Sequence, residues 1–478
     1  MAAFVDQAES FSHGAAPGKA TQPPTLTGVS NRVLTVLTAL VFFSVAGVHL
    51  YTVITHVVNV PYSDEWWALD SDALPAGVSW RWISAFSNEH RIVPTRLLTA
   101  AFYSWTRWNL RYQQIANLGI FAMVLASLVY VRSLAADAMR GWTFFAFLVF
   151  LLSPIACENH STGMQSCFHF VLAFSVMSAA LLFHPRRNTL HFLLGLLFLA
   201  GACFSLATGV AAALAIVVIF TYVEVKRKGW LALGALYLYT AMVLAIWFHG
   251  YVRSRYYPGF TTLLSTRYWV FFLNLVGLGF GFTAVSAVSG GIVFAVVVIP
   301  IARLLLRDRR DPLPEGAWPI VAATVGVLAM LASVTAGRVS FPIAQSKMSR
   351  YAEIGFVLIA LAALLWSVCL RGTRLWRNAA LLSLWCLVIL GYHDNWAFAA
   401  AYEQVRTERL AGLGCVKKYL EGEGSDHCPM IFSLPIGEKA NTAKRLGLSF
   451  VDDVRPTVAP GLRKVSSTPP VVSLGRAK

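Results

Sequence analysis

Charged residues are scarce in this chain. Only 13% of its 478 residues are Asp, Glu, Lys or Arg, against roughly 25% in an ordinary soluble domain. A single soluble core stops growing beyond about 250 to 300 residues. A mean hydropathy of +0.61 over this length therefore excludes an ordinary soluble enzyme, and it predicts a protein that crosses a membrane many times.

Three further absences narrow the class. The seven cysteines show no metal-ligand spacing, and the apolar runs show no ladder of alternating segments of the kind that a membrane β-barrel needs. Residues 1–30 lack the charged start, apolar core and cleavage site of a secretory signal, so we expect them to form a disordered cytoplasmic tail. The fold class that remains is an all-α, polytopic integral membrane protein.

Long apolar runs supply the spans of the expected transmembrane domain, residues 31–396. A span needs about 20 residues to cross the hydrocarbon. We expect eleven spans, near residues 34–58, 115–131, 142–155, 168–183, 190–204, 210–223, 230–248, 285–306, 318–334, 352–370 and 381–392. The glycine-broken stretch 268–284 is expected to be an interfacial or re-entrant segment.

Basic residues cluster in the short loops on one side of these spans. They are Lys19, Arg32, Arg132, Arg140, Arg186, Arg187, Lys226, Arg227, Lys228, Arg303, Arg307, Arg309, Arg310, Arg371, Arg374 and Arg377. By the positive-inside rule this side is cytoplasmic, and the net charge of +16 needs no nucleic acid to explain it. We expect an integral membrane protein.

An odd number of spans places the longer segments on the extracytoplasmic side. These are the loops 61–110, 157–166, 250–267 and 336–350 and a small C-terminal tail, residues 397–478. They combine Trp, Tyr, His and acidic residues with Arg, a mixture that topology alone does not require. Any chemistry is therefore expected on this face.

An acidic pair, Asp64 and Glu65, begins just beyond the first span. Two carboxylates there can hold a divalent cation such as Mg²⁺ or Mn²⁺, or one can act as a general base. Consecutive helical residues diverge by about 100°, so we expect one carboxylate to face the site and the other to support it. An ordinary solvated loop beside an aromatic belt is the alternative.

The sequence Asn88-Glu89-His90-Arg91 lies further along the same loop. Glu89 and His90 form a candidate acid/base or metal pair, and Arg91 is a candidate phosphate ligand. A capping network without a substrate is the alternative.

The segment 157–166 places Glu158, His160 and Gln165 beside spans, where charged groups are costly enough to indicate function or pairing. We interpret these three as candidates for binding an acceptor or a sugar. Cys157 and Cys167 are one candidate disulfide in an oxidising compartment, and Cys415 and Cys428 in the tail are the favoured one.

Basic residues beside tyrosines recur on the outer face. They are Arg253 and Arg255 beside Tyr256, and Lys347 and Arg350 beside Tyr351. Positive charge here runs against the topology rule, so we expect a phosphate at the headgroup level. Binding to the headgroups of bulk lipid is the alternative.

An acidic pair directly after the first span resembles the first-loop motif of the GT-C superfamily of polytopic glycosyltransferases, which includes protein mannosyltransferases and lipid-linked aminoarabinose transferases. The motifs NEHR (88–91), ENHSTGMQ (158–165) and SRY (349–351) are similar to those of related bacterial membrane proteins, which implies a bacterial inner membrane. The resemblance implies an inverting transfer from a polyprenyl-phosphate sugar, with Asp64 deprotonating or orienting the acceptor. The tail is too short for the large outer domain of oligosaccharyltransferases, so the acceptor stays open among a cell-envelope glycan, a lipid and a protein.

Three other functions share parts of this pattern. A flippase or transporter of lipid-linked saccharides would carry mid-membrane charges and internal repeats, whereas the charges here lie at span ends and no repeat is evident. A polymerase or ligase would share the donor and differ in the acceptor. An acyltransferase would use a reactive histidine such as His90 or His160.

Overall fold

The computed structural model describes residues 26–135, 139, 141–252, 263–281, 285–370, 373–396 and 398–453. The α-helices are α1 (Leu26–His56), α2 (Trp80–Ser84), α3 (Val93–Thr106), α4 (Leu110–Leu134), α5 (Gly141–Leu151), α6 (Cys157–Ser161), α7 (Ser166–Leu182), α8 (Thr189–Cys203), α9 (Ala207–Arg227), α10 (Trp230–Phe248), α11 (Thr266–Gly277), α12 (Ala287–Asp308), α13 (Ala317–Arg338), α14 (Ala352–Cys369), α15 (Arg374–Trp396), α16 (Ala399–Leu420), α17 (Gly437–Arg445) and α18 (Ser449–Asp452).

Short elements connect the helices. The 3-10 helices are η1 (Ser63–Leu69), η2 (Leu74–Ala76), η3 (Pro154–Ala156), η4 (Gly163–Gln165), η5 (Leu278–Phe280), η6 (Ile343–Lys347) and η7 (Ser349–Tyr351). In the described part of the chain the only sheet is an antiparallel pair, β1 (Phe86–Ser87) with β2 (His90–Arg91).

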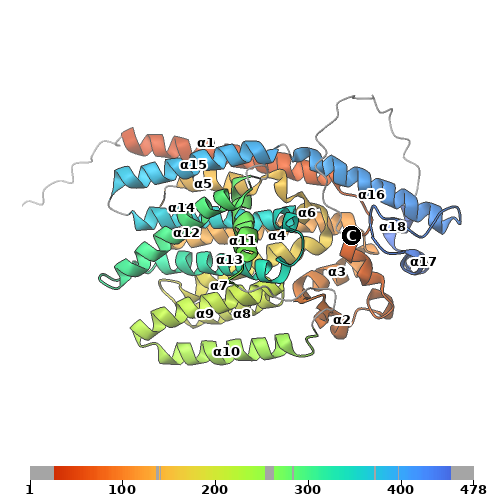
Figure 1. The fold of residues 1–478 in the computed structure, drawn as a ribbon, viewed down its shortest axis with the longest axis horizontal. Helices are drawn as coiled ribbons and strands as arrows, with labels where there is room; N and C mark the ends of the chain where they lie inside the picture. Colours follow the sequence, from red (N-terminus) through yellow and green to blue (C-terminus); the bar gives the residue numbers. More distant parts are fainter. Residues whose placement is uncertain are drawn as a thin grey trace, which may run out of the picture.

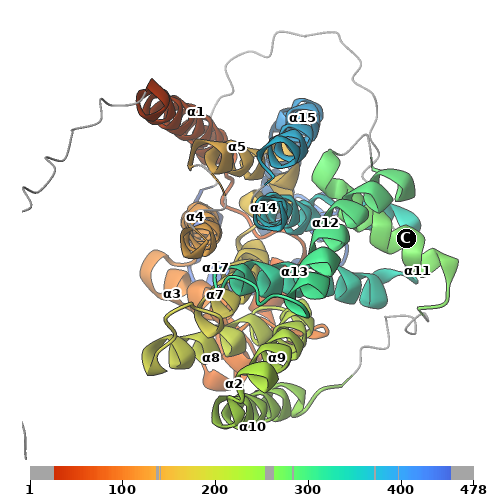
Figure 2. The ribbon, with the colours of Figure 1, turned by 90° about the vertical axis from the view of Figure 1, so that its left-hand side faces the viewer.

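The long helices run roughly side by side along the length of the molecule (Figure 1), and Figure 2 shows the bundle from one end. Ten helical stretches of the described residues are long and apolar enough to cross a membrane, and α8 is a shorter apolar helix. The eleven predicted spans coincide with α1, α4, α5, α7, α8, α9, α10, α12, α13, α14 and α15. The predicted all-α, polytopic fold class is confirmed.

The stretch expected to be interfacial or re-entrant forms α11 and η5. At 12 residues α11 is too short to cross the hydrocarbon. The predicted tail 1–30 lies mostly outside the described residues, and α1 begins at Leu26, a few residues before the predicted boundary.

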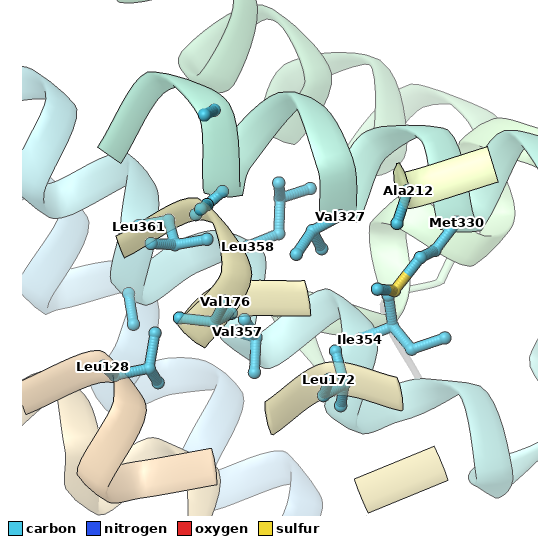
Figure 3. Close-up of a cluster of buried hydrophobic side chains, with 14 of the residues drawn as sticks. Leu128, Leu172, Val176, Ala212, Val327, Met330, Ile354, Val357, Leu358 and Leu361 are labelled. Carbon is cyan, nitrogen blue, oxygen red and sulfur yellow. The ribbon is translucent and has the colours of Figure 1, made fainter. Parts of the chain in front are cut away.

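Burial differs between helices according to their place in the bundle. Nearly every residue of α14 is buried, whereas much of α1 is exposed on the outside, where a membrane would cover it. Figure 3 shows the bundle interior around α14, where Ile354, Val357 and Leu358 lie beside Leu172 of α7 and Val327 of α13.

A second apolar cluster forms at one end of the bundle, where α2, α3, α16, α17 and α18 lie (Figure 1). It joins the loop after α1 to the C-terminal tail, and it includes Trp66 and Trp108 from the loop and Phe432 and Phe450 from the tail. We call the two segments 58–110 and 398–453 together the cap. The Asn59 side-chain amide fastens them by donating to Ser449 Oγ at 3.1 Å.

Within the cap a disulfide joins Cys415 to Cys428, as predicted. The alternative bond between Cys157 and Cys167 is wrong, because both thiols are free and buried. Cys157 packs with Val53 and Tyr402, whereas Cys167 packs in the main apolar cluster of the bundle.

Candidate functional site

A cavity of about 760 Å³ opens at the end of the bundle that carries the cap. Its polar wall includes seven of the residues that the sequence singled out, namely Asp64, Glu89, His90, Glu158, Gln165, Arg350 and Tyr351. These come from η1, the β1–β2 hairpin, α6, η4 and η7, so the fold gathers motifs that lie up to about 290 residues apart.

Another wall of the cavity is mostly apolar. It is made by residues of α9 and α10 and the segments before and after them, including Leu206, Val210, Leu214, Trp247 and Phe248. Leu214 and Phe248, which belong to this wall, are exposed. The cavity is thus amphipathic, because its lining combines ionisable and apolar side chains.

Asp64 and Glu65 have separate positions. Asp64 lines the cavity, where desolvation raises the pKa of its carboxyl above 3.8 although Arg350 and Arg338 oppose that rise. Glu65 is buried, and its two oxygens accept the backbone N–H groups of Tyr62 at 2.9 Å and Met164 at 3.1 Å. Glu65 therefore joins η1 to η4.

The turn that presents Asp64 is strained. Ser63 has a φ of 52°, a left-handed backbone conformation that residues other than glycine adopt at a cost in free energy. The Ser63 N–H donates to the Ile431 carbonyl of the tail at 2.7 Å. Residues of the C-terminal tail thus stabilise the backbone conformation that points Asp64 into the cavity.

Glu89 and His90 line a neighbouring part of the cavity wall and contact α13 and α9. Glu89 Oε1 lies 2.7 Å from Arg338 Nη2 and 3.5 Å from His90 Nε2. His90 Nδ1 accepts the N–H of Ala207 at 3.4 Å, which satisfies a donor at the start of α9. Desolvation lowers the pKa of His90 to about 4, so its ring is neutral at pH 7 and is held between Glu89 and α9.

Glu158 organises a third part of the wall. Its Oε1 lies 3.3 Å from Arg350 Nε and accepts from Gln165 Nε2 at 3.5 Å, while its Oε2 accepts from Ser349 Oγ at 3.2 Å. These contacts fix the direction of the Arg350 side chain. Tyr351 lies beside them, with its ring 6.0 Å from that of Phe168.

Arg91 is not placed as a phosphate ligand. Its guanidinium is directed into the protein, where it donates to the Trp247 carbonyl at 2.9 Å and to the carbonyls of Ser84 and His249. Carbonyls at the end of a helix lack intrahelical donors, so a buried Arg at the end of α10 satisfies them. The interpretation of Arg91 as a ligand is wrong for this reason, and it acts as a cap.

His160 and Lys347 also lie outside the cavity wall. His160 follows Glu158 by two residues on α6, and two steps of about 100° turn its ring into the core, where it contacts Glu353. Lys347 ends η6, and it is half-buried without lining the cavity. Arg253, Arg255 and Tyr256 lie outside the described residues.

Two arginines of the site were missed by sequence reasoning. Arg338 lines the cavity at the end of α13, inside the outer segment 336–350 whose other basic residues we selected. Arg409 of α16 is buried, with its Nη2 donating to Thr162 Oγ1 at 2.7 Å and its guanidinium 4.7 Å from the Tyr62 ring centre. Arg338 could have been found from the sequence, because it is a basic residue in an outer segment. No local sequence pattern indicates that Arg409 belongs to the site.

No family model and no curated protein matches the sequence. The chain is similar to two crystal structures of ArnT from Cupriavidus metallidurans. The structure bound to undecaprenyl phosphate is 14% identical and covers 86% of this chain and 77% of ArnT, with a TM-score of 0.45. The apo structure is 16% identical and covers 89% of this chain and 78% of ArnT, with the same TM-score of 0.45. At this similarity the matches carry no information about donor, acceptor or mechanism, which have to come from the side chains of the site.

Proposed function

We propose that this protein is a membrane glycosyltransferase that transfers a sugar from a polyprenyl-phosphate donor to an extracytoplasmic acceptor. The observation that carries the proposal is the amphipathic cavity, whose lining combines three carboxylates and two arginines with an apolar wall at the end of a membrane bundle. A lipid-linked sugar is amphipathic in the same way, because it joins an apolar isoprenoid chain to a charged phosphate and a polar sugar ring.

The apolar wall of α9 and α10 suits the isoprenoid chain. Leu214 and Phe248 are exposed and line the cavity, and in this proposal the chain reaches the polar wall along them. Transfer out of water contributes about 0.8 kcal/mol per methylene, and this energy already holds such a chain in the membrane. The apolar wall therefore guides the chain and positions the donor, while the polar contacts supply the selectivity.

The phosphate of the donor would bind beside Arg350 and Arg338. A guanidinium carries several N–H donors in a planar fork, so the contact of Glu158 with Arg350 Nε leaves donors on the same group for a second anion. Glu158 then sets the direction of Arg350, and Arg338 adds a second positive charge to the wall. Both charges would stabilise the phosphate as it leaves.

Asp64 is the proposed base. Its raised pKa makes its carboxylate a better proton acceptor than one with the ordinary pKa of 3.8. The acceptor hydroxyl oxygen forms a bond to the anomeric carbon of the sugar from the face opposite the phosphate, and the bond from that carbon to the phosphate oxygen breaks. The hydroxyl proton passes to Asp64, and the bonding electrons leave with the polyprenyl phosphate. Attack from the opposite face inverts the anomeric carbon.

The remaining polar residues of the wall are suited to sugar hydroxyls. Glu158 and Gln165 contact each other at the cavity surface, and together they offer both acceptors and donors. His90 and Glu89, proposed from the sequence as an acid/base pair, hold the start of α9 and Arg338 in this account.

The experiment that tests the function is a donor screen. Membranes containing the protein, and matched membranes without it, are given a panel of polyprenyl-phosphate sugars carrying radiolabel in the sugar. We expect one donor to be consumed, with label appearing in a product and free polyprenyl phosphate accumulating. Movement of the intact donor across the bilayer without release of polyprenyl phosphate would instead indicate a flippase.

A further inference from the structure

Outside the cavity, the bundle core contains a group of ionisable side chains that the proposed reaction does not use. His160 of α6, His169 of α7 and Glu353 of α14 are each at most 1% exposed, and one ligand atom from each lies within 4.8 Å of the others. Each residue comes from a different helix. Within the described residues this is the one group of three such side chains close enough to hold a metal ion.

The two histidines contact Glu353 in different ways. His160 Nε2 lies 3.0 Å from Glu353 Oε1, yet it makes no hydrogen bond in this arrangement. His169 Nε2 is hydrogen-bonded to Glu353 Oε1 at 3.1 Å and lies 3.0 Å from Oε2. Ligands around one tetrahedral ion are about 3.3 Å apart for bonds near 2.0 Å, because each atom is directed at the ion and not at its neighbour.

The surroundings favour a cation. The Glu353 carboxylate is buried among apolar helices, where an ionised group is costly unless a positive charge compensates it. The other close polar contact of this carboxylate is a hydrogen bond from the Asn159 side chain, 3.1 Å from Oε2. A further buried imidazole, His49 of α1, has its ring centre 4.6 Å from that of His160 and an Nε2 without a hydrogen-bond partner.

We propose that His160, His169 and Glu353 bind a structural zinc ion, with His49 available at the fourth position. Two imidazoles and one carboxylate are a common zinc ligand set, and a structural site is completed by a fourth ligand. The ion would fasten α6, α7 and α14 to one another directly behind the cavity wall. Asn159 continues this connection to the cavity, because it donates to both Glu353 and the Arg350 carbonyl.

This proposal is independent of the proposed transferase function, since none of the three ligands lines the cavity. The test is the metal content of purified, tag-free protein after incubation with Zn²⁺ and dialysis against a weak chelator. We expect about one zinc per chain. His169→Ala and Glu353→Gln should lose it, whereas His191→Ala, a change to a histidine elsewhere in the chain, should retain it. A wild-type content below about a tenth of a zinc per chain, or unchanged zinc in both variants, would overturn the proposal.

A second measurement covers the case in which these variants do not fold. The wild-type protein loaded with Co²⁺ should show the intense visible absorption of a tetrahedral ion, and added Zn²⁺ should remove it. A spectrum like that of hydrated Co²⁺ would mean that Glu353 is neutralised by the histidines alone, and would equally overturn the zinc site.

Discussion

Arg338 and Glu89 form an ion pair at the cavity, with Nη2 and Oε1 2.7 Å apart. Arg338 ends α13, and Glu89 lies in the turn between β1 and β2. The pair therefore fastens the loop after α1 to the bundle and holds the Arg338 guanidinium at the cavity wall.

A double-mutant cycle on this pair measures its strength. Glu89→Gln and Arg338→Gln should each lower the stability, and the double variant should lose less than the sum because the second change no longer breaks a contact. We expect a coupling of about 1 to 3 kcal/mol for this largely buried pair. The exposed pair Arg307–Asp311 is the control, with an expected coupling of about 0.5 kcal/mol. Equilibrium unfolding in mixed micelles gives both values, and equal couplings would contradict the structural role of the pair.

Neutralising Arg350 should weaken donor binding. Charge-assisted hydrogen bonds contribute about 1.5 to 3 kcal/mol, so Arg350→Gln should raise the Kd for polyprenyl phosphate about 10-fold to 100-fold. Arg309→Gln, at the cytoplasmic end of α12 by the charge rule, should leave the Kd unchanged. The same loss of affinity in both variants would show that Arg350 is not a specific ligand of the phosphate.

Replacing Glu65 should lower the stability of the protein more than replacing Asp64 does. Glu65→Gln replaces one acceptor oxygen with an NH₂ that faces a backbone N–H, so one buried donor loses its partner at a cost of about 1 to 3 kcal/mol. Asp64→Asn removes no such contact. Thermal unfolding in detergent should therefore show a clearly lower midpoint for Glu65→Gln than for Asp64→Asn. The reverse order would show that Glu65 is not the residue that joins η1 to η4.

The pH dependence of kcat follows from the position of Asp64. A general base works when ionised, and desolvation raises the pKa of Asp64, so the rate should fall on acidification at a pH above 3.8. Arg350 lowers this pKa, hence Arg350→Gln should move the acid limb to higher pH when kcat is measured at saturating donor. Arg309→Gln should leave the limb in place. If the acid limb of the pH–rate profile moves to lower pH in Arg350→Gln, Asp64 is excluded as the titrating group.

The spans could be predicted because each apolar run has the length of a helix. Asp64, Glu158 and Arg350 could be predicted as candidate site residues because ionisable residues beside spans are costly without a role. The directions of the side chains could not be predicted. Arg91 and His160 lie in the same motifs as cavity residues, yet Arg91 caps α10 and His160 is turned into the core. Arg409 was missed because its partners Tyr62 and Thr162 are distant in the sequence and meet it only in the folded cap.

The measurement that tests the central claim most directly compares Asp64→Asn with Asp72→Asn, a matched change to an exposed aspartate of the same loop outside the cavity. Sugar transfer and polyprenyl-phosphate binding are measured on both purified variants with the donor found in the screen. Removing a general base costs about 100-fold to 10,000-fold in rate, so Asp64→Asn should lose transfer to this extent, while Asp72→Asn stays near the wild-type rate and both variants bind polyprenyl phosphate normally. A folded Asp64→Asn protein that transfers sugar at close to the wild-type rate would contradict the account.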